Sequence, residues 1–225
     1  MLGADLRRVE RMVQRGEIPS QKVSGQTRIH RIQIQQWLHR EMGTMESEHL
    51  DELDSGMTAT RQVVPDGALV TPLLRMEAIS TDLGARTKSS ALRRLVALAD
   101  ETGLVWDRDA LLAGVQEREE MGATALPGGV AIPHPIRPLP YGLAEPIIVV
   151  ARSEQPLVFG PDYGKTTQLF FLTASQEAAQ HLHVLARLCR MLKDEAWVLE
   201  LLQAQTPRGM LELLIQREAD LMASM

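Results

Sequence analysis

The sequence has one cysteine, few aromatic residues and no long hydrophobic run. Only 4% of its 225 residues are aromatic. Cys189 has no second cysteine to pair with, which excludes an intramolecular disulfide and a cysteine-based zinc cluster and favours a reducing, cytoplasmic setting. The longest apolar runs, residues 146–151 and 169–172, are far shorter than the ~20 residues of a membrane helix, and the N-terminus has no signal-peptide core. We therefore expect neither a membrane span nor secretion.

Charge divides the chain into three parts. The whole sequence carries a formal charge of -5, but residues 1–42 hold eight basic against four acidic side chains. Residues 43–66 contain six acidic residues and few large apolar ones, which predicts a solvated, acidic linker. At roughly 150 residues per domain, the length predicts one full domain, residues 67–225, and an appendage.

The first 42 residues have the pattern of a small basic module. Arginines recur at helical spacing from Arg7 to Arg15, short alternating segments flank Gly25, and a second helix is expected at about residues 32–42. A helix, a basic two-stranded wing and a helix can present charge to DNA. The alternative is that the basic helix face is merely solvated.

The stretch "VERMVQRGEIPSQKVSGQTRIHRIQIQQWL" resembles the second half of excisionase-type or MerR-like helix-turn-helix domains. Only residues 1–4 stand where that family's preceding helix should end, so the expected module is a partial one. The resemblance implies DNA as a partner of residues 1–42. The candidate DNA-binding residues are Arg7, Arg8, Arg11, Lys22 and Arg28.

From residue 67 onward, segments with helical period alternate with short β-branched or aromatic runs, which predicts an α/β domain. Thr87 and Asp107 are the expected N-caps of its first two helices. A glycine-containing segment then leads to His134, which stands between two prolines. Because each proline restricts the backbone, His134 is expected on a stiff strand end.

A histidine at such a position can be structural, or its neutral imidazole can act as a nucleophile and carry a phosphoryl group. A phosphoryl group needs hydrogen-bond donors for its oxygens. The candidate donors are the backbone of Gly128 and Gly129, the hydroxyl of Thr124 and the guanidinium of Arg118.

A second histidine pair lies in a helix expected at about residues 176–193. Helical spacing places His181 inward at the helix start and His183 toward water. The two rings should point about 200° apart, so we expect no metal site from this pair. An inward imidazole near a helix N-terminus is well placed to help bind an anion.

The segment "REEMGATALPGGVAIPHP" resembles the phosphorylation motif of the IIA domains of the bacterial phosphoenolpyruvate-dependent phosphotransferase system, of the fructose, mannitol and nitrogen-regulatory type. The resemblance covers roughly residues 67–218 and includes "EPIIVVARSEQPLVFG", "QLFFLTA" and "HLHVLARLCRMLKD". It implies a mixed sheet of four or five strands with helices on both faces. It also implies that His134 accepts the phosphoryl group, that His181 is its partner, and that Arg118 and Thr124 belong to the phosphate site.

The same resemblance implies an HPr-type phosphocarrier as donor, no cofactor, and a phosphocarrier rather than a multiple-turnover enzyme. Two roles stay open: a regulator, linked to DNA or to a target protein, and a transport component that passes phosphate to a separate IIB protein. The basic N-terminus, and the lack of anything like a IIB, IIC or HPr module in the sequence, favour regulation. A IIA domain that has lost phosphotransfer and only binds partners is a third reading.

Overall fold

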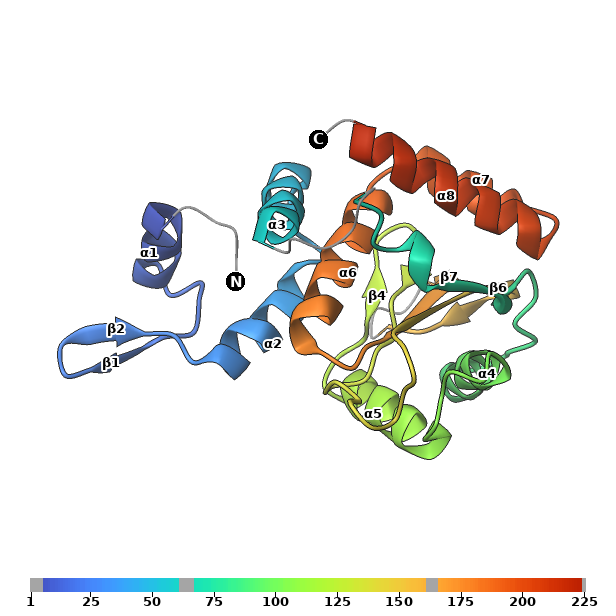
Figure 1. Ribbon diagram of the computed structural model, residues 1–225, viewed down its shortest axis with the longest axis horizontal. Helices are drawn as coiled ribbons and strands as arrows, with labels where there is room; N and C mark the ends of the chain where they lie inside the picture. The colour runs from blue at the N-terminus through green and yellow to red at the C-terminus, as the bar shows by residue number, and fades with distance from the viewer. Residues whose placement is uncertain (1–5, 61–66, 161–165, 224–225) are drawn as a thin grey trace.

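The computed structural model describes residues 6–60, 67–160 and 166–223 (Figure 1). Its N-terminal part consists of α1 (Leu6–Gln14), β1 (Gln21–Val23), β2 (Gln26–Arg28), α2 (Arg31–Glu41) and α3 (Ser47–Thr60). None of the helices in the described ranges combines the length and the apolar character needed to cross a membrane.

The main part begins with a 3-10 turn, η1 (Thr71–Leu73), and contains one five-stranded mixed sheet. The strand order is β3-β6-β7-β5-β4, in which β3 runs parallel to β6, β6 antiparallel to β7, β7 parallel to β5 and β5 antiparallel to β4. The strands are β3 (Leu74–Ser80), β4 (Ala125–Leu126), β5 (Val130–Ala131), β6 (Ile147–Val158) and β7 (Thr166–Ala174). The helices are α4 (Lys88–Glu101), α5 (Arg108–Glu120), α6 (Ala178–Met191), α7 (Glu195–Gln203) and α8 (Pro207–Ala223).

Helices cover both faces of this sheet, as the sequence predicted. Successive residues of the central strands alternate between two hydrophobic cores, because side chains along a strand point to opposite faces. Phe170 packs in the core with α4 and α5, whereas Phe171 packs in the core with α6, α7 and α8. The predicted N-caps are also present, since Thr87 accepts from the Ser90 amide and Asp107 from the Ala110 amide.

The N-terminal part contains the predicted helix, hairpin and helix. Strands β1 and β2 pair in antiparallel register around a turn at Ser24 and Gly25, both with positive φ, which suits a two-residue hairpin loop. In Figure 1 this hairpin extends away from the sheet, whereas α2 lies beside α6.

The predicted acidic linker is wrong for Ser47–Thr60, which form α3. Its acidic residues fall mostly on one side of the helix, and Leu50, Leu53 and Met57 recur at the spacing of the opposite side, where they are buried in the same core as α6. Because this apolar side is narrow, the composition of the segment reflects its acidic residues and does not reveal the buried side of a helix. Of the remaining predicted linker, residues 43–46 connect α2 to α3, and residues 61–66 lie outside the described residues.

A buried network of charges connects α3 to α6 and α8. Asp54 on α3 accepts a 2.6 Å hydrogen bond from Nε of Arg187 on α6, and both side chains are fully buried. Arg187 also contacts Glu218 on α8, whose carboxylate accepts from the backbone amides of residues 69, 70 and 71. The hydrogen bonds and charges of His183 and Arg187 hold the pKa of Asp54 below its ordinary value, although burial alone would raise it.

The prediction that His183 faces water is wrong. Its ring is only 4% exposed and its Nε2 lies 3.0 Å from the Thr58 hydroxyl and 3.2 Å from the Asp54 carboxylate. The side of α6 that carries His183 and Arg187 is therefore polar but buried, because α3 covers it.

Replacing Asp54 by Ala should lower the free energy of unfolding by about 3 kcal/mol, because Arg187 would be left buried with only part of its charge compensated. Urea unfolding measures this. The matched control is Glu48→Ala, an exposed position on the same helix, which should change stability by less than about 0.5 kcal/mol. Equal effects of the two substitutions would contradict the structural role of the network.

Candidate functional site

His134 stands at the end of the short strand β5, in a segment that is anchored on both sides. The Ile132 amide donates to the Thr124 carbonyl, the Thr173 amide donates to the Pro133 carbonyl, and the Ile136 amide donates to the Gly114 carbonyl, at 3.0 to 3.1 Å. The Nδ1 of His134 lies 2.8 Å from the Ile132 carbonyl oxygen. A carbonyl can only accept, so Nδ1 carries the proton and Nε2 keeps its lone pair.

That lone pair faces Arg118, near the end of α5. Nε of Arg118 donates to Nε2 of His134 at 3.1 Å, and its Nη1 donates to the Gly122 carbonyl at 2.8 Å. Gly114, one helical turn earlier on α5, permits this approach, since a Cβ there would lie 3.0 Å from Cβ of Pro135. The structure thus places Arg118 beside His134, and its role toward a phosphoryl group stays a prediction.

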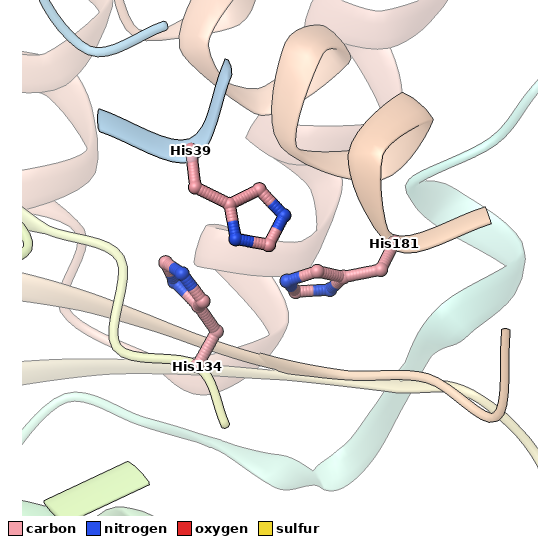
Figure 2. Close-up of side chains that lie close together, drawn as sticks. All are labelled: His39, His134 and His181. Carbon is pink, nitrogen blue, oxygen red and sulfur yellow. The ribbon is translucent and has the colours of Figure 1, made fainter. Parts of the chain in front are cut away.

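Three imidazoles converge at the site (Figure 2). His181 comes from the first turn of α6 and His39 from the last turn of α2, in the N-terminal part. The ring centroids of His39, His134 and His181 are 5.0 to 5.1 Å apart in all three pairs. Both ring nitrogens of His181 are buried without a hydrogen-bond partner among the described residues, so this ring is available to a ligand.

The environment keeps all three rings neutral. Burial, reinforced by Arg118, lowers the pKa of His39 to about 4. Burial also moves the pKa values of His134 and His181 well below the usual range, with further lowering from the neighbouring imidazoles and from Arg118. A neutral imidazole with an unprotonated Nε2 is the form that can attack phosphorus. In His134 this nitrogen accepts from Arg118, so that hydrogen bond must break before the attack.

The other predicted phosphate-site residues differ in their placement. Thr124 is buried beside the site, and its hydroxyl and amide both donate to the Glu119 carboxylate, which also pairs with Lys88 at 2.7 Å. Gly128 and Gly129 form the turn between β4 and β5, at the hairpin end opposite Thr124 and Ile132. They do not line the described cavities at His134, so the structure does not bring their amides to the site.

The site opens into a cavity of about 290 Å³ whose walls come from α2, α5, the segment before β4 and α6. No carboxylate is among its described lining residues, which include Arg40 and Arg118. Cys189 also lines it, but burial raises the pKa of this thiol to about 12, so it stays protonated. Nitrogen atoms of the three histidines lie within 4.8 Å of one another and could hold a metal ion, yet the guanidinium at His134 and the lack of carboxylates favour an anion.

Residues 72–217 match the family described as "Phosphoenolpyruvate-dependent sugar phosphotransferase system, EIIA 2". This chain belongs to that family. The match covers the sheet, its helices and the His134 segment, whereas His39 and all of α1 to α3 precede it.

Curated relatives of this EIIA chain include fructose-specific EIIA components and nitrogen regulatory proteins. It is 32% identical over 155 residues to the fructose-specific EIIA component of Haloferax volcanii. This alignment covers 68% of this chain and 97% of the relative. It is 36% identical over 129 residues to a nitrogen regulatory protein of Bradyrhizobium diazoefficiens, covering 56% and 81%. The match to the fructose-specific EIIABC component of Bacillus subtilis, at 27% identity, covers 23% of that longer protein.

Solved structures show the same fold. IIA mannitol from Escherichia coli superposes with a TM-score of 0.56 at 23% identity, covering 63% of this chain and 98% of that one. The complex of IIA mannitol with phosphorylated IIB mannitol, also from Escherichia coli, gives a TM-score of 0.55 at 22% identity, covering 64% and 97%. The prediction of an EIIA-type mixed sheet is confirmed.

Sequence reasoning missed His39. The helix that carries it was predicted, but a single histidine near the end of a helix has no pattern that marks it as part of a distant site. The candidate DNA-binding residues lie far from the histidines in the fold: Arg7 and Arg11 are exposed on α1, and Lys22 and Arg28 are exposed on the hairpin. The side chain of Arg8 lies outside the described part of the chain.

Between pH 7 and pH 5 the free energy of unfolding should fall, because the unfolded chain protonates its histidines near pH 6.5 whereas the folded protein holds His39, His134 and His181 neutral. Each lowered pKa contributes stability that is present above the unfolded value and lost as the pH falls. One histidine accounts for up to about 1.4 kcal/mol per pH unit.

Urea unfolding of His39→Gln at the two pH values measures the share of one ring. The loss of stability from pH 7 to pH 5 should be smaller than in the unmodified protein, and His49→Gln on α3, an exposed position, should leave it unchanged. A wild-type pH dependence in His39→Gln would show that this ring is not held neutral in the fold.

Proposed function

We propose that this EIIA protein accepts a phosphoryl group on Nε2 of His134 from an HPr-type phosphohistidine donor. The observation that carries the proposal is the hydrogen bond from Nδ1 to the Ile132 carbonyl, which leaves Nε2 unprotonated and accepting from Arg118, beside a cavity with no carboxylate among its described lining residues. The bond between phosphorus and the donor nitrogen breaks as the bond to Nε2 forms, and the donor imidazole keeps the electron pair.

Catalysis here requires positioning and charge neutralisation more than covalent assistance. Arg118 balances charge on the phosphoryl oxygens, and His181 can donate to one of them from a ring nitrogen that has no other described partner. Thr124 donates both its hydroxyl and its amide to the Glu119 carboxylate, so it would have to exchange this partner to bind a phosphoryl oxygen.

The role we propose for phosphorylation is regulatory. The site is built in part from α2, which lies outside the EIIA family match, so the phosphorylation state bears directly on the N-terminal part. Relatives of both kinds exist, since one is named a nitrogen regulatory protein and another a fructose-specific EIIA component. Transfer of the phosphoryl group from this protein to a separate IIB protein would favour the transport role instead. Either role places the protein in the cytoplasm, with its donor.

Incubation with phosphoenolpyruvate, enzyme I and an HPr-type donor should add one acid-labile phosphoryl group, seen by intact mass. His134→Ala should abolish the gain, and His49→Ala, at an exposed position of α3, should retain it. Phosphorus-coupled NMR of the histidine ring should place the group on Nε2. No gain with a donor that phosphorylates another EIIA protein would reject the phosphocarrier function.

As a second candidate function, we propose that the N-terminal part binds DNA. The exposed cations of the wing hairpin, Lys22 and Arg28, and the exposed Arg7 and Arg11 of α1 support it. A lysine or arginine that contacts a phosphate strengthens binding in a way that depends on salt.

Binding of the full chain to a labelled random-sequence DNA duplex, measured over a range of salt concentrations, tests this role. Combining Lys22→Gln with Arg28→Gln should weaken binding and reduce the slope of log K against log salt by about two. Glu48→Gln, at an exposed position of α3, should not change the slope. No binding to any duplex at low salt would remove DNA from the list of partners.

A further inference from the structure

The helix α2 forms one wall of the phosphorylation site. Its residues Gln36, His39, Arg40 and Gly43 line the same cavity as Arg118 and His134. His134 and His181 are only 3% and 5% exposed, and the ring of His39 contacts both. A donor protein can therefore reach Nε2 only when α2 has moved aside.

The charges at this wall are unbalanced in the unmodified protein. Arg40 and Arg118 both line the cavity. Burial lowers the pKa of Arg118, and the like charge of Arg40 lowers it further. Glu119 offsets part of this charge, but Glu119 is already paired with Lys88. In the closed arrangement the cavity thus has room and positive charge and no described anion.

We propose that α2 is a clasp that closes on the phosphoryl group of His134, with His39 and Arg40 as its contacts to the phosphoryl oxygens. The proposal rests on the proposed function, and it adds to the EIIA site two residues from outside the family match. A phosphoryl group with a charge of about -1.5 to -2 attracts both Arg40 and Arg118, and this attraction offsets the repulsion between the two guanidinium groups. It also gives a ring nitrogen of His39 an acceptor.

The position of the cavity decides the direction of the effect. The cavity of about 290 Å³ lies between α2 and His134, so we infer that a phosphoryl group on His134 extends into it and leaves α2 in place. Phosphorylation should therefore hold α2 in place, and α2 should shield the phosphoryl group from water and from acceptor proteins.

Hydrogen exchange of the amides in α2, with and without phosphorylation of the full chain, tests the clasp. Phosphorylation should slow exchange in α2 by about tenfold or more, the effect expected of one hydrogen bond to a charged group. His39→Gln and Arg40→Gln should still become phosphorylated, but should lose most of this slowing and release phosphate faster. His49→Gln and Arg94→Gln, both exposed and outside the cavity, are the matched controls and should behave as the unmodified protein.

Unchanged exchange in α2 on phosphorylation would overturn the proposal, and so would faster exchange, which would mean that the phosphoryl group expels the helix. Absence of phosphorylation would count against the proposed function alone, because inorganic phosphate tests the clasp separately. Added to the unmodified protein, phosphate should shift the NMR signals of His39 together with those of His134 and His181, and Arg40→Gln should weaken its binding. Shifts at His134 and His181 without His39 would overturn the clasp.

Discussion

The pairing of Asp54 with Arg187 is the contact on which the arrangement of the site depends. Both charges are removed from water, so the pair is stable only if its hydrogen bonds are all made, and this fixes α3 against α6 in one position. Helix α6 carries His181 two turns before Arg187, and α3 follows α2 after a short connection. Fixing α3 therefore places His181 and His39 together opposite His134.

The three imidazoles need this external support because they do not hold one another. Neutral rings at about 5 Å gain little from mutual contact, and the ring nitrogens of His181 have no described hydrogen-bond partner. Each ring is positioned by its backbone instead: His134 by two prolines and a bonded carbonyl, His181 by α6, and His39 by α2. The cluster is consequently prepared for a ligand that supplies the missing hydrogen bonds.

Much of the fold and the placement of His134 could be predicted from the sequence, because their signals are local. Proline on each side of His134, the helix caps at Thr87 and Asp107, and the hairpin around Gly25 are set by backbone preferences of neighbouring residues. The features that were missed depend on distant partners. His183 is buried because α3 covers it, and His39 reaches the site because α2 packs against α6. No spacing along the chain records either contact.

Linkage makes the relation between α2 and His134 reciprocal. If a phosphoryl group strengthens the closed position of α2 by some factor, closure of α2 strengthens retention of the phosphoryl group by the same factor. Any partner that draws the N-terminal part away from α6 would then weaken that retention. Because α2 follows the β1–β2 hairpin directly, a ligand of the hairpin and a phosphoryl group on His134 would both act on the position of one helix. Two-way regulation therefore requires no change in the EIIA sheet, only a change in where α2 lies.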